Sequence, residues 1–179
     1  MSPRVVLIGA PGAGKTTIGR SVAHRLGVDF RDTDADIARA AGKPVSQIFI
    51  DDGESAFRAM EAAAVAEALR THDGVLALGG GAVLAPATRA ALRGHRVVYL
   101  EVTLATAARR VGFNRDRPLL LHNPRATLRA LLDERRPIYR SVATAVVAAD
   151  GRVSDVVAKV LAVVQPTDST PSDALRGQR

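Results

Sequence analysis

The feature that most constrains this chain is segment 9–16, with the sequence Gly-Ala-Pro-Gly-Ala-Gly-Lys-Thr. It follows an apolar run at residues 5–8 and precedes a segment whose apolar residues recur with helical spacing. A strand, a GxxxxGK[ST] loop and a helix in this order form a P-loop. Its glycines let backbone N–H groups turn inward around an anion, and the helix start adds more N–H groups and the positive end of its dipole. The segment therefore predicts a binding site for a nucleoside triphosphate.

Individual residues of this loop have distinct predicted roles. The Lys15 ammonium would reach the β- and γ-phosphates, and the Thr16 hydroxyl would ligate Mg²⁺. The chain otherwise uses Arg for positive charge, since lysine occurs only at positions 15, 43 and 159. A glycine turn that binds nothing is the alternative, and the complete pattern in its strand–helix context disfavours it. The residues expected to bind the nucleotide here are Gly12, Ala13, Gly14, Lys15, Thr16 and Thr17.

Length and composition favour one domain with an aliphatic core. The chain has 179 residues, of which 47% are hydrophobic and only 3% aromatic. It contains no cysteine, which excludes disulfides, thiolate metal sites and cysteine nucleophiles. No secretory signal is recognisable, and no apolar run approaches the ~18 residues of a membrane span. We expect a cytoplasmic protein with a single domain at 1–164 and a disordered tail at 165–179.

The net charge of +7 raises the question of a nucleic-acid partner. Arginines crowd the region between residues 109 and 140, where Phe113 and Tyr139 are the only aromatic residues available to stack on bases. A dense arginine segment in a protein that handles triphosphates instead favours contacts with phosphate. We therefore expect a small-anion ligand and no nucleic acid. We also expect no membrane partner and a monomer.

Five short apolar segments alternate with helical patterns along the chain. The alternation predicts an α/β fold, a five-stranded parallel sheet with helices on both faces. The expected strands are 4–9, 28–31, 75–78, 96–102 and 145–148. The expected helices are 15–26, 35–41, 54–70, 86–93, 103–111, 124–135, 138–143 and 154–164, with a further short segment after Pro44.

Local signals set several helix ends. Thr33 or Asp34 could N-cap the helix at 35–41, and Ser154 the last helix. Pro137 is expected to end the preceding helix, because the residue before proline is pushed out of the α region. In the helix at 54–70, the apolar residues expected to pack inward are Phe57, Met60, Ala64 and Leu69.

Three clusters of polar or small residues suggest a site at the carboxyl ends of the strands. Residues 32–36 contain three aspartates, more than helix capping alone explains, and ligands bind at this edge in open α/β folds. A glycine triplet at 79–81 directly follows a buried strand, so its N–H groups can approach a ligand. Arg58 and Glu61 share one helix face and could form a simple ion pair. Residues 112–124 lack a clear period and are expected to form a mobile lid.

These features separate the chain from two large classes of P-loop protein. It has neither an NKxD-type guanine motif nor a hydrophobic strand ending in Asp-Glu, so a GTPase and a large ATPase are disfavoured. Acids after the second strand, an arginine-rich lid and a glycine triplet suit phosphoryl transfer to a small acceptor.

From about residue 4 to residue 164 the chain resembles the shikimate kinase family. The resemblance rests on the P-loop, Asp32-Thr33-Asp34, Gly53-Glu54-x-x-Phe57-Arg58-x-x-Glu61, Gly79-Gly80-Gly81-Ala82, Arg117-Pro118-Leu119-Leu120 and Arg135-x-Pro137-x-Tyr139. It implies a P-loop kinase fold of the nucleoside-monophosphate-kinase type, with a substrate-binding segment at about 33–61 and a lid at about 112–124. It also implies MgATP-dependent phosphorylation of the shikimate 3-hydroxyl, on the path through chorismate to aromatic amino acids.

The resemblance also implies roles on the acceptor side. Asp34 would orient the acceptor hydroxyl or take its proton, and these two roles stay open. Arg58 and Arg135 would clamp the substrate carboxylate. The backbone N–H groups of Gly79, Gly80 and Gly81 would bind ring hydroxyls. Glu61 would orient Arg58, while Phe49 and Phe57 would wall the pocket.

On the nucleotide side, Asp32 would hold Mg²⁺ opposite Thr16. Lys15 and Arg117 would neutralise charge on the transferring phosphoryl group, Arg117 arriving with the lid. Arg117 and Arg152 are expected among the nucleotide contacts, and Arg110 is a further candidate. A kinase of another small polyol acid such as gluconate, or a non-catalytic nucleotide-binding regulator, remains as an alternative.

Overall fold

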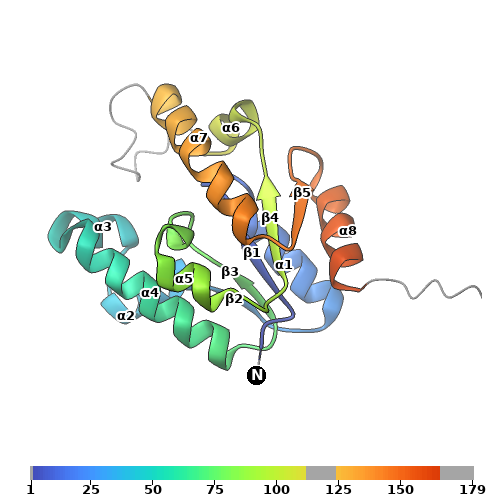
Figure 1. Cartoon of the computed structure of the whole chain (residues 1–179), viewed down its shortest axis with the longest axis horizontal. Helices are drawn as coiled ribbons and strands as arrows, with labels where there is room; N and C mark the ends of the chain where they lie inside the picture. The colour runs from blue at the N-terminus through green and yellow to red at the C-terminus, as the bar shows by residue number, and fades with distance from the viewer. Residues whose placement is uncertain (1, 112–123, 166–179) are drawn as a thin grey trace, which may run out of the picture.

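The computed structural model describes residues 2–111 and 124–165 and contains a five-stranded sheet (Figure 1). The strands are β1 (Val5–Ile8), β2 (Phe30–Asp32), β3 (Val75–Ala77), β4 (Val97–Glu101) and β5 (Ala145–Ala148). Their order is β2-β3-β1-β4-β5, and every neighbouring pair is parallel. Central strand β1 is fully buried, as its continuous apolar sequence requires. The predicted five-stranded parallel sheet is confirmed.

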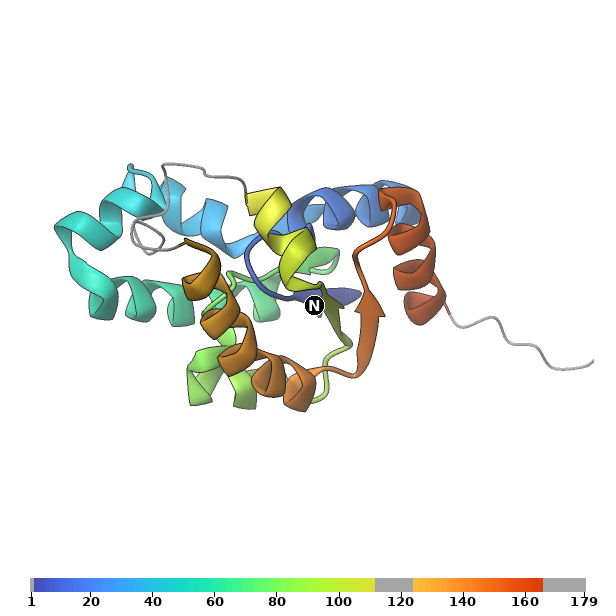
Figure 2. The same cartoon turned by 90° about the horizontal axis from the view of Figure 1, so that it is seen from above.

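Helices cover both faces of this sheet, which confirms the predicted α/β class. Figure 2 shows α1 and α8 on one side of the sheet and α5 and α7 on the other. The helices are α1 (Lys15–Leu26), α2 (Thr33–Ala41), α3 (Val45–Asp51), α4 (Gly53–Thr71), α5 (Pro86–Ala91), α6 (Leu104–Val111), α7 (Pro124–Val142) and α8 (Val153–Val164), with a 3₁₀ turn η1 at Ala82–Leu84.

The core is aliphatic, as the composition predicts, and has two parts. The main cluster joins the sheet to α1, α4, α7 and α8. A smaller cluster of Ile37, Ile48 and Phe57 ties α2, α3 and α4 into one lobe beside the sheet. This lobe contains most of segment 33–61, so its packing determines where the acceptor-side residues lie.

Two predicted helix caps are wrong. Helix α2 begins at Thr33, and its N-cap is Asp32, whose carboxylate accepts a hydrogen bond from the Asp34 N–H at 3.0 Å. The cap comes one residue earlier because β2 extends to Asp32 and passes directly into the helix. Ser154 does not cap α8, which begins at Val153, and its hydroxyl donates instead to Asp155.

Two further expectations about helices are also wrong. Pro137 does not end the preceding helix but lies inside the continuous α7. One lost backbone hydrogen bond is tolerated there because Leu132 and Tyr139 bury the same helix against the core. Met60 is 39% exposed rather than packed inward, and Ala68 is fully buried instead. The continuous alanine stretch of α4 weakens the hydrophobic period from which a buried face is inferred.

The expected lid and tail lie largely outside the described residues. Arg117 and nearly all of segment 112–124 belong to the part of the chain that the structure does not describe, as do residues 166–179. The proposed single-domain boundaries therefore stay predictions. Among the described residues, no helix is long and apolar enough to span a membrane.

Candidate active site

The P-loop connects β1 to α1 at the carboxyl end of the sheet. Gly12 and Gly14 take positive φ angles of 80° and 90°, which a residue with a side chain rarely adopts. Gly14 is the N-cap of α1 and supplies no side-chain hydrogen bond, so the first N–H groups of the helix are directed at the loop. The loop thus has the backbone conformation that an anion site at a helix N-terminus needs.

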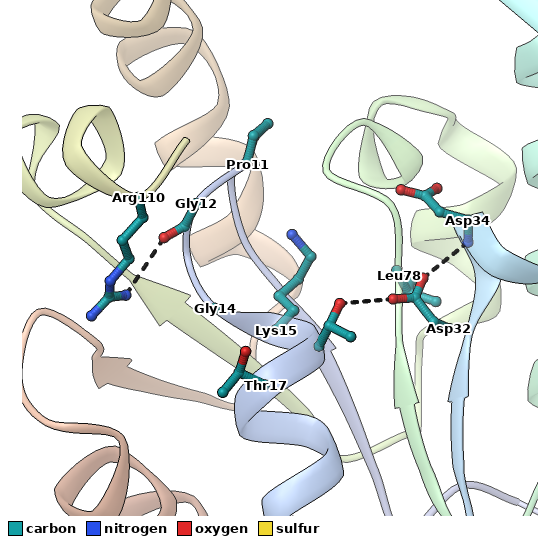
Figure 3. A pocket seen from close by; sticks show the side chains of 10 residues that line it. Pro11, Gly12, Gly14, Lys15, Thr17, Asp32, Asp34, Leu78 and Arg110 are labelled. Atoms are coloured by element: carbon teal, nitrogen blue, oxygen red, sulfur yellow. Dashed lines mark hydrogen bonds between the residues drawn. The ribbon is translucent and has the colours of Figure 1, made fainter. Parts of the chain in front are cut away.

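A cavity of about 380 Å³ opens over this loop (Figure 3). Figure 3 shows Lys15 entering it from the P-loop and Asp34 from the start of α2. Lys15 Nζ donates to the carbonyls of Gly9 at 2.7 Å and Ala10 at 3.2 Å, which folds its side chain over the loop. The residues that line the cavity are Pro11, Gly12, Gly14, Lys15, Thr16, Thr17, Asp32, Asp34, Leu78 and Arg110.

Thr16 and Asp32 meet at the floor of the cavity. The Thr16 hydroxyl donates to Asp32 Oδ2 at 2.9 Å, while Asp32 Oδ1 caps α2. The aspartate is thus held from two sides, with its carboxylate beside the phosphate loop. Two hard oxygen donors next to a triphosphate site suit Mg²⁺, which takes one or two protein carboxylates and completes its shell with phosphates and water.

The glycine triplet brings the acceptor-side residues together. A Cβ atom at Gly79 would lie 2.5 Å from Asp34 Oδ1 and 2.6 Å from Glu61 Oε1. At Gly81 it would lie 2.2 Å from Arg58 Nη1. A side chain at either position would therefore displace these carboxylates or this guanidinium, because the backbone passes within contact distance of them. The Thr33 hydroxyl accepts a hydrogen bond from Gly79 N–H at 3.2 Å and fixes the start of the triplet.

Arg58 and Glu61 form the predicted ion pair, with 2.6 Å between Nη1 and Oε2. The Glu61 side chain is almost fully buried, whereas that of Arg58 is 24% exposed. Arg58 also lies over the ring of Phe57, at 5.4 Å from its centroid, and Phe57 contacts Phe49 with ring centroids 4.5 Å apart. The guanidinium is thereby held between an aromatic wall and a buried carboxylate.

Arg135, on α7, contacts the same triplet. Its Nη1 donates to the carbonyl of Gly80 at 3.2 Å. Its Nε is buried and has no hydrogen-bond partner among the described residues. A Cβ at Gly80 would lie 3.1 Å from Pro11 Cδ, so the triplet also contacts the P-loop. Asp34, Arg58 and Arg135 therefore surround one stretch of backbone that borders the phosphate loop.

The two remaining arginine candidates on the nucleotide side behave differently. Arg110 lines the cavity and donates to the carbonyl of Ala13 at 3.3 Å and to that of Gly151 at 3.4 Å. Arg152 does not line it; its side chain is 87% exposed and pairs with Asp155 at 3.3 Å. The structure thus brings Arg110 to the site and leaves Arg152 beside it.

Three contacts at the site were not foreseen from the sequence. Pro11 and Leu78 line the cavity, and the Tyr139 hydroxyl donates to the carbonyl of Gly80. Pro11 lies inside the P-loop and Leu78 immediately precedes the triplet, so their positions next to predicted site residues could have indicated that they line the cavity. No local pattern indicates that a tyrosine four residues after Arg135 meets the same carbonyl.

We expect replacement of Glu61 by Gln to change how stability depends on pH. Burial raises the pKa of Glu61 above its ordinary value of 4.5, against the opposing hydrogen bond from Arg58. In the window above 4.5 the folded chain therefore holds a proton that the unfolded chain has lost, so this carboxyl's contribution to stability falls as pH rises. Urea unfolding from about pH 4 to about pH 7 should show wild type losing stability relative to Glu61→Gln as pH rises. Glu67→Gln, on the exposed side of α4, is the control. A difference in stability between wild type and Glu61→Gln that does not change with pH would contradict the raised pKa of Glu61.

The fold and this site define an ATP-dependent, small-molecule kinase of the P-loop type. The shikimate kinase family model matches residues 11–165. A shikimate kinase of Salinispora tropica is 60% identical over 167 residues, covering 93% of this chain and all of its own length. The chain belongs to the shikimate kinase family.

Solved structures agree with this assignment. The shikimate kinase from Acinetobacter baumannii in complex with shikimate superposes with a TM-score of 0.88 at 35% identity, covering 94% of this chain and 96% of that one. A gluconokinase from Sinorhizobium meliloti has a TM-score of 0.57 at 21% identity over 89% of this chain and 90% of that one. The second likeness shows a shared fold only.

Proposed function

We propose that the protein transfers the γ-phosphoryl group of ATP to the 3-hydroxyl of shikimate, giving shikimate 3-phosphate and ADP in the chorismate pathway. One observation carries this proposal. A phosphate-binding loop borders a glycine triplet that is surrounded by two carboxylates and two arginines, with Pro11 of the loop in contact with Gly80. That combination suits an acceptor with both hydroxyl groups and a carboxylate, adjacent to a triphosphate.

In this proposal Asp34 acts on the acceptor hydroxyl. Its carboxylate lies in the cavity opposite Lys15 and beside the glycine triplet. It would accept a hydrogen bond from the attacking hydroxyl, orient its oxygen toward the γ-phosphorus and take the proton as the P–O bond forms. Placing nucleophile and phosphate in line is the main catalytic demand of phosphoryl transfer.

Arg58 and Arg135 would bind the substrate carboxylate. Guanidinium groups make paired, charge-assisted hydrogen bonds with carboxylates, a geometry that lysine cannot reproduce. The buried Nε of Arg135, which has no described partner, supports a ligand there. The N–H groups of Gly80 and Gly81, which have no acceptor among the described residues, would bind ring hydroxyls. The Gly79 N–H, also predicted for this role, donates instead to the Thr33 hydroxyl.

On the nucleotide side, Lys15, Thr16 and the loop N–H groups would hold the triphosphate. Lys15 would neutralise charge on the transferring group, and Arg117 would add to this from the lid. Thr16 and Asp32 would hold Mg²⁺, which when bound would supply positive charge to offset that of the triphosphate. Within residues 2–111 and 124–165, no cluster of three or more acidic or histidine side chains could hold a metal alone, so phosphate oxygens would complete its shell.

Three further expectations from the sequence remain without a test. A role for Arg152 in nucleotide binding rests on the resemblance alone, and its pairing with Asp155 offers it no support. The monomeric state and the cytoplasmic location also stay predictions.

A turnover assay with a panel of acceptors tests the proposed function. ADP release should depend on shikimate and should be much slower with quinate, gluconate or no acceptor. Preference for gluconate would favour the other small-acid kinases, and hydrolysis that is independent of any acceptor would reject the assignment. ATP binding without turnover of any acceptor would instead favour a non-catalytic regulator.

We expect Arg58→Ala to raise the KM for shikimate by about 10- to 100-fold and to leave the KM for ATP within about twofold, because a charge-assisted hydrogen bond contributes about 1.5–3 kcal/mol. Arg58→Lys keeps a positive charge beside Glu61 and should still raise the shikimate KM, since an ammonium group lacks the planar pair of N–H donors that binds both oxygens of a carboxylate. Arg70→Ala, which breaks a similar i,i+3 pair with Glu67 on the same helix, is the control. Equal effects on both KM values would contradict a carboxylate-binding role.

A further inference from the structure

The carbonyl of Gly80 accepts two hydrogen bonds from the same face of α7. One comes from Arg135 Nη1 at 3.2 Å and the other from the Tyr139 hydroxyl. The two donors are four residues apart, so they lie one above the other on the helix. Together they use both lone pairs of this oxygen.

This carbonyl determines where the next N–H group points. The peptide bond between Gly80 and Gly81 is trans and planar, so its oxygen and the Gly81 N–H point in opposite directions. Holding the oxygen toward α7 therefore turns the Gly81 N–H away from α7. Glycine has no side chain to restrict this rotation, and the two donors act directly on this peptide group.

The Tyr139 hydroxyl is itself firmly placed. Its ring is 1% exposed and stacks on Tyr99 of β4, with ring centroids 4.9 Å apart and an angle of 24° between the planes. Burial raises the pKa of Tyr139 to about 12, so the hydroxyl remains a donor at neutral pH. The ring stack thus connects the centre of the sheet to the glycine triplet.

Tyr139 lies two residues beyond a proline inside α7. Pro137 lies between Arg135 and Tyr139 and removes one backbone hydrogen bond from this part of the helix. Glu101, at the carboxyl end of β4, accepts hydrogen bonds from Arg140 Nε at 3.1 Å and Nη2 at 2.9 Å. Tyr139 and Arg140 therefore fix α7 to β4 just beyond the interrupted turn, with Tyr139 on the side that faces the site.

We propose that Tyr139 is a positioning residue for the acceptor: its hydroxyl, through the Gly80 carbonyl, holds the Gly81 N–H and the Arg135 guanidinium in the orientation that receives a hydroxylated carboxylic acid. Tyr139 does not touch the acceptor itself. The inference rests on the proposed function, since it assigns Tyr139 to the same acceptor site.

Tyr139→Phe tests this role, because it keeps the ring and its stack on Tyr99 and removes only the hydroxyl. Loss of one hydrogen bond that orders the site should raise the KM for shikimate about five- to tenfold and leave the KM for ATP within about twofold. The change should shrink in an Arg135→Ala background, because the two donors act on one carbonyl. Thermal unfolding of the same samples measures any general loss of stability.

Tyr99→Phe is the matched control, since it removes the hydroxyl of the partner ring, which does not contact Gly80. It should leave both KM values within about twofold of wild type. Tyr139→Phe with an unchanged shikimate KM, or with equal rises in both KM values, overturns the positioning role. These outcomes are distinct from failure of the proposed function, in which wild type itself would not phosphorylate shikimate.

Discussion

Asp34→Asn should lower kcat with shikimate by about 10³-fold, within the range observed when a general base is removed. Asparagine keeps the size and the hydrogen-bonding ability of the side chain, so the cavity should keep its shape and ATP should still bind. The amide cannot take the hydroxyl proton, and it has lost the negative charge that orients the hydroxyl. Steady-state kinetics and an equilibrium titration with ATP measure these two quantities separately.

Asp36→Asn provides the control for this experiment. Asp36 lies two residues further along α2, where it pairs with Arg31 and Arg39 and does not line the cavity. Its replacement should leave kcat within about twofold of wild type, because its side chain lies outside the cavity. If Asp34→Asn also retained near-wild-type turnover, the role proposed for Asp34 would be wrong.

Lys15→Met should lower kcat by about 10²- to 10³-fold, the usual cost of removing one group that stabilises transition-state charge. Methionine retains an unbranched, apolar side chain of similar length, so the loop can keep its backbone conformation. ATP affinity should fall as well, because the ammonium contacts phosphate in the ground state. Single-turnover measurements at saturating ATP separate the loss in the chemical step from the loss in binding.

Lys159→Met is a suitable control for Lys15→Met. Lys159 is exposed on α8 and does not line the cavity. Its replacement removes the same charge from the protein and should leave kcat within about twofold of wild type. If Lys15→Met recovered full kcat at high ATP, Lys15 would contribute only to ground-state binding of ATP, and its proposed role in stabilising transition-state charge would be wrong.

Much of the fold could be predicted because several elements are encoded locally. The apolar run at residues 5–8, the glycines of the P-loop and the glycine at position 27 together locate β1 and α1, and α1 has the predicted bounds Lys15–Leu26. The ion pair of Arg58 with Glu61 follows from helical spacing alone. Such features can be predicted from neighbouring residues in the sequence, without information on contacts between distant segments.

Other features depend on tertiary contacts and could not be predicted. Pro137 is a strong local stop signal, yet burial of α7 against the core outweighs it. Met60 follows the helical period, yet no element packs over it among the described residues and it is 39% exposed. The contact between Tyr139 and Gly80 joins residues 59 positions apart, and no pattern within one helix indicates it.

The candidate site was therefore predicted better in its composition than in its geometry. One cavity is lined by Asp32, Asp34 and five of the six predicted P-loop contacts, whereas Ala13 is buried and does not line it. The close packing of the glycine triplet against Asp34, Glu61 and Arg58 is a property of three elements brought together, α2, α4 and the segment after β3. A side chain at position 79 or 81 would displace these groups.

Identification of the reaction product by NMR tests the central proposal most directly. The protein is incubated with ATP, Mg²⁺ and shikimate, and phosphorus and proton spectra locate the transferred group. The account predicts a single new phosphate ester on the 3-hydroxyl of shikimate, formed in equal amount with ADP. Inorganic phosphate as the main product, or an ester at a different hydroxyl, would contradict it.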